Sequence, residues 1–302
     1  MKQLYYALLL LTSMLWAGNF VSGKFMVGHA SPFVLTELRW ILAVLILAFI
    51  VYYQERSFKI PKEAILPLMM MGLTGIIFFN VFLYLALENT SADTVGLLST
   101  LNPISIAVMS FIFLREKLTF RQMIAMFISL AGVFIVLTNG QFDDIWSHTA
   151  FNIGDIYMLI AVLVWGGYSV AGKIAMKYVS PYMSTFWSGI FGSLFLLPFT
   201  AKEMISIQGP LSFWTAVAYT VVGSTVLAMV FWNIGVHHIG GTTSGMFLNF
   251  NPLFTAIFAY FLLGETLGFS QFIGAIMIIL GVLSFTRKVE TKPIPIHEKL
   301  RL

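Results

Sequence analysis

The chain has 302 residues, of which 59% are hydrophobic and 10% are charged. Soluble domains carry about 25% charged residues, so this composition excludes a soluble enzyme, a nucleic-acid-binding protein and a disordered protein. The sequence contains no cysteine, which excludes disulfides, thiolate nucleophiles and cysteine-ligated zinc. These proportions are typical of a chain that lies mostly in a lipid bilayer.

Apolar stretches of membrane-spanning length follow one another along the chain. A spanning helix needs about 20 mainly apolar residues, and no alternating pattern typical of a β-barrel occurs. The sequence therefore predicts an all-α integral membrane protein with ten transmembrane helices. In chain order, the predicted spans are Leu4–Lys24, Phe33–Tyr53, Ile65–Leu87, Thr94–Leu114, Gln122–Thr138, Gly154–Lys173, Tyr182–Phe199, Phe213–Val236, Thr242–Leu263 and Ser270–Thr286.

The two ends of the chain need separate interpretation. The first apolar run resembles a signal peptide, but it continues past Gly18 toward Lys24 and is longer than a signal's apolar region. We therefore expect an uncleaved first helix. The last sixteen residues, 287–302, are polar and basic, and they predict a disordered tail.

The basic residues predict the orientation. With both termini inside, 14 of the 17 Lys and Arg residues fall in inside segments, whereas Lys24 and Lys202 lie outside. The longest outside loop contains three aspartates and no Lys or Arg. This bias follows the positive-inside rule, so we expect an even number of spans with both termini in the cytoplasm.

The two halves of the sequence repeat each other at a constant offset of 149 residues. Five spans lie in each half, and an odd number forces the second half to enter the membrane from the opposite side. Such an inverted-topology repeat is typical of secondary transporters, whose site lies near the midplane between the halves; a duplicated structural protein without cargo is the alternative. The matching anchors are Trp16/Trp165, Gly23/Gly172, Lys24/Lys173, Ser31/Ser180, Pro32/Pro181, Asn102/Asn251, Pro103/Pro252, Glu116/Glu265, Leu118/Leu267, Gln122/Gln271, Gly132/Gly281 and Val133/Val282.

With these motifs, the chain resembles the EamA-type transporters of the drug/metabolite transporter superfamily. The resemblance rests on the Trp-x6-Gly-Lys ends of the first and sixth spans, the Asn-Pro pairs, and a Glu-x-Leu-x3-Gln segment in each half. It implies export of amino acids or related metabolites across a bacterial cytoplasmic membrane, by alternating access without ATP. It also implies a central cavity walled by helices one, three, four, six, eight and nine. The predicted division is a first repeat at 1–140, an external loop at 141–153, a second repeat at 154–286 and a cytoplasmic tail at 287–302.

The Asn-Pro pairs fall near the centres of the fourth and ninth spans. Proline removes a backbone donor and disturbs the preceding turn, and the carbonyls this frees need partners inside protein or beside a water-filled cavity. Breaks at matching positions of two halves indicate a transporter site, although a simple packing kink is the alternative. Polar and aromatic residues near mid-span complete the predicted substrate-binding set, which is Trp16, Asn19, Phe79, Asn80, Tyr84, Asn102, Trp165, Tyr168, Trp232 and Asn251.

These side chains offer amide hydrogen bonds between aromatic walls, with no fixed charge expected at the centre. Such a site suits a zwitterion or a neutral amphiphile. A cationic drug is the alternative solute, because aromatic faces bind cations through cation–π contacts. Amide groups can instead serve only as links between helices.

Four charged residues are candidates for gating or charge roles: Lys24, Glu37, Arg39 and Lys173. The two lysines are expected at opposite mouths, either extended toward the interface or acting as gates. Glu37 and Arg39 point to different sides of the second span. Arg39 beside Trp40 fits an anchor at the outer interface, and a gating or substrate role is the alternative.

The remaining motifs restrict the chemistry. Glu116 and Glu265 are expected to stabilise helix starts, and the adjacent His237 and His238 cannot face one another as metal ligands. No Walker A, GxSxG or HExxH motif occurs, so the sequence predicts no enzyme activity, cofactor, metal or nucleic-acid partner. The expected partners are a small-molecule substrate and the bilayer, and monomer and homodimer both stay open. Carriers of larger solutes such as nucleotide-sugars, and a non-transport membrane scaffold, are the alternatives to metabolite export.

Overall fold

The computed structural model describes residues 2–138, 152–205, 207–263 and 268–286. The described residues form a bundle of helices and contain no strand. The elements are α1 (Lys2–Met26), α2 (Pro32–Glu55), α3 (Lys62–Met71), η1 (Gly72–Phe78), α4 (Phe79–Asn89), α5 (Ala92–Ser99), α6 (Asn102–Leu114), α7 (Phe120–Thr138), α9 (Ile153–Ala175), α10 (Pro181–Met204), α11 (Leu211–Tyr219), η2 (Thr220–Leu227), α12 (Ala228–Ile239), α13 (Gly241–Met246), η3 (Phe247–Phe250), α14 (Asn251–Leu263) and α15 (Phe269–Thr286).

The helices fall at the predicted spans. Eight described segments are long and apolar enough to cross a membrane, and Phe120–Val136 is a shorter apolar helix. The predicted ninth span consists of α13, η3 and α14 in succession. The integral-membrane, all-α prediction is therefore confirmed, and the count of ten stays a prediction. The predicted loop at 141–153, apart from its last two residues, lies outside the described residues, as do Glu265 and the tail at 287–302.

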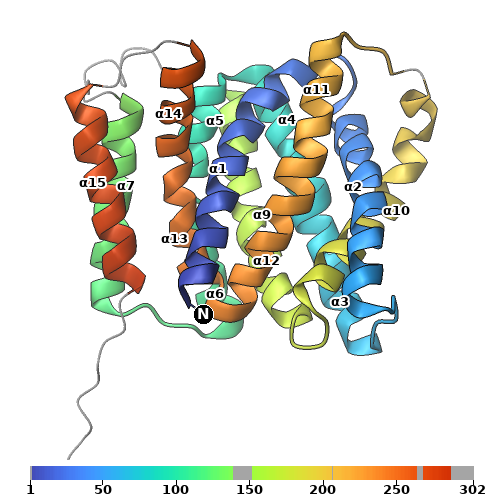
Figure 1. Ribbon diagram of the computed structural model, residues 1–302, viewed down its shortest axis with the longest axis horizontal. Helices are drawn as coiled ribbons and strands as arrows, with labels where there is room; N and C mark the ends of the chain where they lie inside the picture. The colour runs from blue at the N-terminus through green and yellow to red at the C-terminus, as the bar shows by residue number, and fades with distance from the viewer. Residues whose placement is uncertain (1, 139–151, 206, 264–267, 287–302) are drawn as a thin grey trace, which may run out of the picture.

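The two halves run in opposite directions through the bundle. Near its end, α1 places the Nζ of Lys24 2.8 Å from the carbonyl oxygen of Thr90. The residue just before α9, Asn152, reaches the hydroxyl of the same Thr90 through its side-chain amide at 3.5 Å. The end of α1 and the start of its repeat mate α9 thus meet at one end of the bundle. Both ends of the described chain lie together at the lower end in Figure 1.

Small residues bring the last helices of the two halves into close contact. A Cβ at Gly132 of α7 would lie 2.7 Å from the carbonyl oxygen of Gly274 on α15, and one at Gly281 would lie 2.6 Å from the Cβ of Ser129. Because hydrocarbon gives helices little hydrophobic reason to associate, close backbone approach supplies the packing energy. The pair forms one edge of the bundle (Figure 1).

The long helices are interrupted at matching places in the two halves. The helix α6 begins at Asn102 after a turn, and α14 begins at Asn251 after the 3-10 segment η3. Each proline follows at the start of its helix, where a missing N–H costs little. The breaks predicted from the Asn-Pro pairs are thus present.

Two further interruptions were absent from the sequence prediction. The segments η1 and η2 are π-helical, and the offset of 149 places η1 on residues 221–227 of η2. π-Turns are rare and are frequent at functional sites. Both lie in the middle of a predicted span, the third and the eighth.

Candidate substrate-binding site

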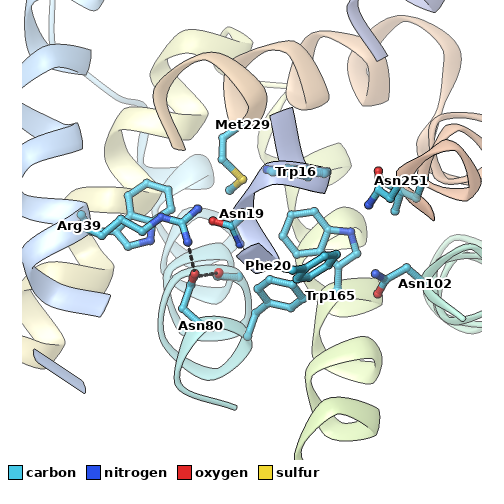
Figure 2. Close-up of a pocket in the computed structure, with 13 residues that line it drawn as sticks. Trp16, Asn19, Phe20, Arg39, Asn80, Asn102, Trp165, Met229 and Asn251 are labelled. Carbon is cyan, nitrogen blue, oxygen red and sulfur yellow. Dashed lines mark hydrogen bonds between the residues drawn. The ribbon is translucent and has the colours of Figure 1, made fainter. Parts of the chain in front are cut away.

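A buried pocket lies between the two halves at these interruptions. It is lined by residues from α1, α2, η1, α4 and α6 of the first half and from α9, α12, η3 and α14 of the second (Figure 2). Its lining residues are Trp16, Asn19, Phe20, Arg39, Trp40, Gly75, Phe79, Asn80, Asn102, Trp165, Met229, Leu248 and Asn251. The walls that the family resemblance implies are all represented, and α2 is an addition to them.

The pocket is almost closed. Its volume is about 30 Å³, and a water molecule needs about 10–15 Å³ on this scale. Two or three water molecules fill such a space, whereas an amino acid does not fit. The structure is therefore a conformation in which the pocket is too small to hold such a solute.

Polar side chains satisfy the backbone of the two π-helices. The amide nitrogen of Asn80 donates to the carbonyl oxygens of Gly75 at 3.0 Å and Ile76 at 2.9 Å. In η2, the Thr225 hydroxyl donates to the carbonyl oxygen of Thr220 at 2.7 Å. Carbonyl groups at membrane depth need such partners. Both π-turns are thus fixed by a side chain five residues further on.

Arg39 joins the two π-helices. Its Nη1 donates to the Oδ1 of Asn80 at 2.9 Å, and its Nε donates to the hydroxyl of Thr225. The side chain is buried, with 4% of its surface exposed. The guanidinium therefore lies between the halves, held by one partner from each.

The interpretation of Arg39 and Trp40 as an anchor at the membrane interface is wrong, because both side chains are buried and line the pocket. The expectation of no fixed charge at the centre is wrong for the same reason. A hydroxyl and an amide on neighbouring helices offer the guanidinium bonds that hydrocarbon cannot, and polar groups in spans turn inward for this reason.

The asparagines of the helix breaks lie across the pocket from Arg39. Figure 2 shows Asn102 and Asn251 together on the side opposite Arg39, with the rings of Trp16 and Trp165 between. Both asparagines are buried, and the Oδ1 of each has no hydrogen-bond partner within the described chain. The same holds for the Oδ1 of Asn19. Unpartnered amide groups around a pocket are suited to bind a polar solute.

Aromatic rings form the middle of the pocket. The Trp16 and Trp165 rings meet edge to face with centroids 5.2 Å apart, and Trp232 packs on them at 5.5 and 5.6 Å. The Nε1 of Trp16 donates to the carbonyl oxygen of Ser224 in η2 at 2.9 Å. Phe79 lies against Trp165 at 4.8 Å. This cluster fixes the repeat-related tryptophans against each other at the interface of the halves.

Three of the predicted binding residues lie behind the lining. Tyr168 stacks on Trp165, and its hydroxyl accepts from the Nδ2 of Asn233 at 2.9 Å. Trp232 supports the tryptophan pair, and Tyr84 is buried outside the lining. These side chains support the walls, while the other predicted binding residues lie on the surface of the pocket.

Five residues of the lining were not predicted from the sequence. Trp40 was assigned to the interface with Arg39, and Gly75 carries no side chain that signals a site. Met229 is the repeat mate of the predicted residue Asn80, so the offset of 149 could have indicated it as a lining residue. Apolar lining positions have no such signal and resemble any packing residue; these are Phe20 and Leu248.

The other charged candidates lie outside the pocket. Lys24 donates to the carbonyl oxygens of Leu87 and Thr90 at the end of α4, and Lys173 pairs with Glu116. Glu37 is fully buried on α2, where Ser193 lies beside its carboxylate. The lysines are thus held at the rims, and their gating role stays a prediction, as does that of Glu37.

The expected helix-start role of Glu116 is wrong. The start of α7 is bound by Thr119 and Gln122: the backbone N–H of Thr119 donates to the Oε1 of Gln122 at 2.9 Å, and that of Gln122 donates to the Thr119 hydroxyl at 3.3 Å. These two residues use the N–H groups that a carboxylate would have taken. Glu116 instead faces Lys173 on α9.

Comparisons with known proteins agree with this architecture. The EamA-like transporter family model matches residues 3–138 and 152–287. The uncharacterized transporter YyaM of Bacillus subtilis is 29% identical over 284 residues, which cover 92% of each chain. An uncharacterized transporter of Archaeoglobus fulgidus is also 29% identical, over 94% of this chain and 97% of its own.

Two more distant proteins extend the comparison. The S-adenosylmethionine/S-adenosylhomocysteine transporter of Chlamydia muridarum is 23% identical over 86% of this chain and 84% of its own. A crystal structure with 18% sequence identity has the same fold, with a TM-score of 0.72 over 95% of this chain and 98% of the other. Because the family match covers both halves of the bundle, the chain is a membrane transporter that belongs to the EamA-like transporter family.

Proposed function

We propose that the protein is a secondary transporter that exports small metabolites, with amino acids and related compounds as the favoured class, across the bacterial cytoplasmic membrane. The observation that carries this proposal is the small buried pocket between two inverted halves, lined by unpartnered amides and aromatic rings. A site of this kind at the repeat interface is the general arrangement in secondary transporters.

The small volume of the pocket supports alternating access as the mechanism. A solute larger than a few water molecules enters only when the halves separate on one side, and it leaves when they separate on the other. The helix breaks and π-turns meet at this interface, so the backbone can change there without disrupting the regular helical segments on either side. The two halves would rock about the pocket.

The chemistry of the lining favours a zwitterion over a cation. Among the described residues, Arg39 is the charged residue of the lining, and no carboxylate lines the pocket. A cationic drug would therefore meet like charge at one end of the pocket. The Chlamydia relatives are named for S-adenosylmethionine and S-adenosylhomocysteine, which both contain an α-amino acid end, and such amino acid derivatives belong to the proposed class.

Solute counterflow tests the proposed function. Proteoliposomes loaded with an unlabelled amino acid are expected to accumulate the labelled form transiently, without ATP, for at least one of the 20 amino acids. Liposomes without protein are the control. Absence of exchange for all amino acids would contradict the proposed substrate class, and absence of exchange for nucleosides, nucleotide-sugars and quaternary amines as well would favour a membrane scaffold.

The proposed orientation is tested separately. Because 14 of the 17 basic residues then lie on the inner side, both termini are expected in the cytoplasm. Alkaline phosphatase and green fluorescent protein fused in parallel to the C-terminus give the measurement, since the former is active only outside and the latter fluoresces only inside. An active phosphatase fusion would contradict the orientation.

A further inference from the structure

Arg39 is a buried cation, and none of the described residues forms an ion pair with it. No carboxylate lines its pocket, and the ion pair found within the described part of the chain joins Lys173 to Glu116 instead. Removing a charge from water without an opposite partner is costly, and more so at membrane depth. An anionic partner that enters from outside the chain would offset the cost of burying the guanidinium.

The guanidinium is held in place and still has donors to offer. It carries five N–H donors; Asn80 and Thr225 take one each, and the Tyr84 hydroxyl is a further partner. These bonds come from the two halves and fix the plane of the group. Figure 2 shows its end directed toward Asn19 and the aromatic rings. A fixed guanidinium fork matches the two oxygens of a carboxylate.

The groups around Arg39 fit the rest of an amino acid. The buried Oδ1 of Asn19, beside the guanidinium, has no partner and can accept from an amino group. Trp16 and Trp165 provide the apolar walls further along, and Asn102 and Asn251 lie at the far side. The pocket thus has a cation at one end, aromatic rings in the middle and two amide side chains at the other end.

From this arrangement we infer that the pocket requires a carboxylate on its solute and that Arg39 is the residue that binds it. The inference rests on the proposed transport function, and it specifies which solutes the site selects. A solute with an amino group and no carboxylate is rejected, and a carboxylic acid without an amino group still binds.

Matched ligands test the requirement on purified full-length protein. We expect thermal stabilisation by L-phenylalanine, L-leucine, L-methionine or L-glutamine, and none by the corresponding carboxamides. For the amino acid that binds, the analogue without the amino group (3-phenylpropionate in the case of L-phenylalanine) is expected to compete, and the analogue without the carboxylate (phenethylamine) is not. The inference would be overturned if acid and carboxamide stabilised the protein equally, or if none of the four acids stabilised it.

The variant Arg39→Gln separates a binding role from a structural one. Glutamine keeps hydrogen-bonding capacity for Asn80 and Thr225 and removes the buried charge, so we expect the unliganded melting temperature to stay equal or rise. Affinity for the acid should fall about ten- to a hundred-fold, which is the loss expected for a hydrogen-bonded charge. Arg39→Lys keeps the charge without the fork and should lie between the two.

The control is Lys202→Gln, which removes the same charge from an exposed position on α10. It is expected to bind the acid as the parent protein does. A lower unliganded melting temperature of Arg39→Gln with unchanged acid affinity would overturn the inference and assign Arg39 to the fold. Exchange of a carboxylate-free solute in counterflow would overturn it too while leaving the transport function intact, whereas failure of all exchange would contradict transport itself.

Discussion

Replacing Asn102 or Asn251 by leucine is expected to reduce transport at least about ten-fold while leaving the protein folded. The Oδ1 of each asparagine is buried without a partner at the pocket, and removing an unsatisfied buried polar group is close to neutral for stability. Leucine has a similar size, so the helix starts stay filled. The loss should therefore fall on the solute, which loses a hydrogen bond at the far side of the pocket.

The measurement is the initial rate of counterflow together with the melting temperature of the purified variant. Asn89→Leu is the matched control, because Asn89 is exposed at the end of α4 and its side chain bonds only the carbonyl of Leu85 in its own helix. Parent-like transport by both pocket variants would show that these asparagines do not contact the solute. A large drop in melting temperature would instead identify them as structural links between helices.

Gly75→Ala is expected to destabilise the protein by about 1–3 kcal/mol, and transport should fall with it. A Cβ at this position would overlap the ring of Tyr168. That ring is held on two sides, by the stack on Trp165 and by the bond from Asn233. It therefore cannot move away without disturbing the tryptophan cluster.

The control for this variant comes from the other half. Gly223 lies in η2, and a Cβ there would meet Leu15 at 3.5 Å, an ordinary contact. Gly223→Ala should therefore melt as the parent does in a detergent-based thermal assay. Adding Tyr168→Leu to Gly75→Ala should cost less than the sum of the two single changes, because the ring that clashes is gone. Additive effects would show that the predicted overlap is not the cause.

The overall fold was accessible from the sequence because its signals are strong. Spans of about 20 apolar residues are hard to mistake, and the offset of 149 relates Trp16 to Trp165 and Asn102 to Asn251 without a gap. Proline in the middle of a span kinks or breaks the helix. Helix limits, the two-repeat architecture and the interruptions before Pro103 and Pro252 follow from these features.

The role of Arg39 was not accessible because helices in lipid are apolar on all sides. In a soluble protein, periodicity shows which face of a helix is buried; in a membrane, the lipid face and the core face have the same composition. The rotation of α2 that brings Arg39 inward and leaves Phe49 exposed is therefore invisible in the pattern. Proximity to Trp40 then favoured an interface position.

The π-helices were missed for a related reason. One extra residue in a turn shifts the faces of a helix, but the shift leaves no trace when every face is apolar. A weak signal did exist: Gly75 and Asn80, like Thr220 and Thr225, are five residues apart, which is the spacing of a π-turn. Five-residue spacing of polar groups within an apolar span is common enough that it indicates a π-turn only in hindsight.

The two halves carry different residues at one pair of repeat-related positions, and this difference affects the free energies of the states in the transport cycle. In an inverted repeat with identical halves, the inward-open and outward-open states are images of each other and have equal free energies. Here Arg39 corresponds to Ser188, so exchanging the conformations of the halves does not regenerate the same set of charges. The unloaded carrier is thereby free to rest on one side, and the size of that bias sets how much binding energy its solute must supply to reverse it.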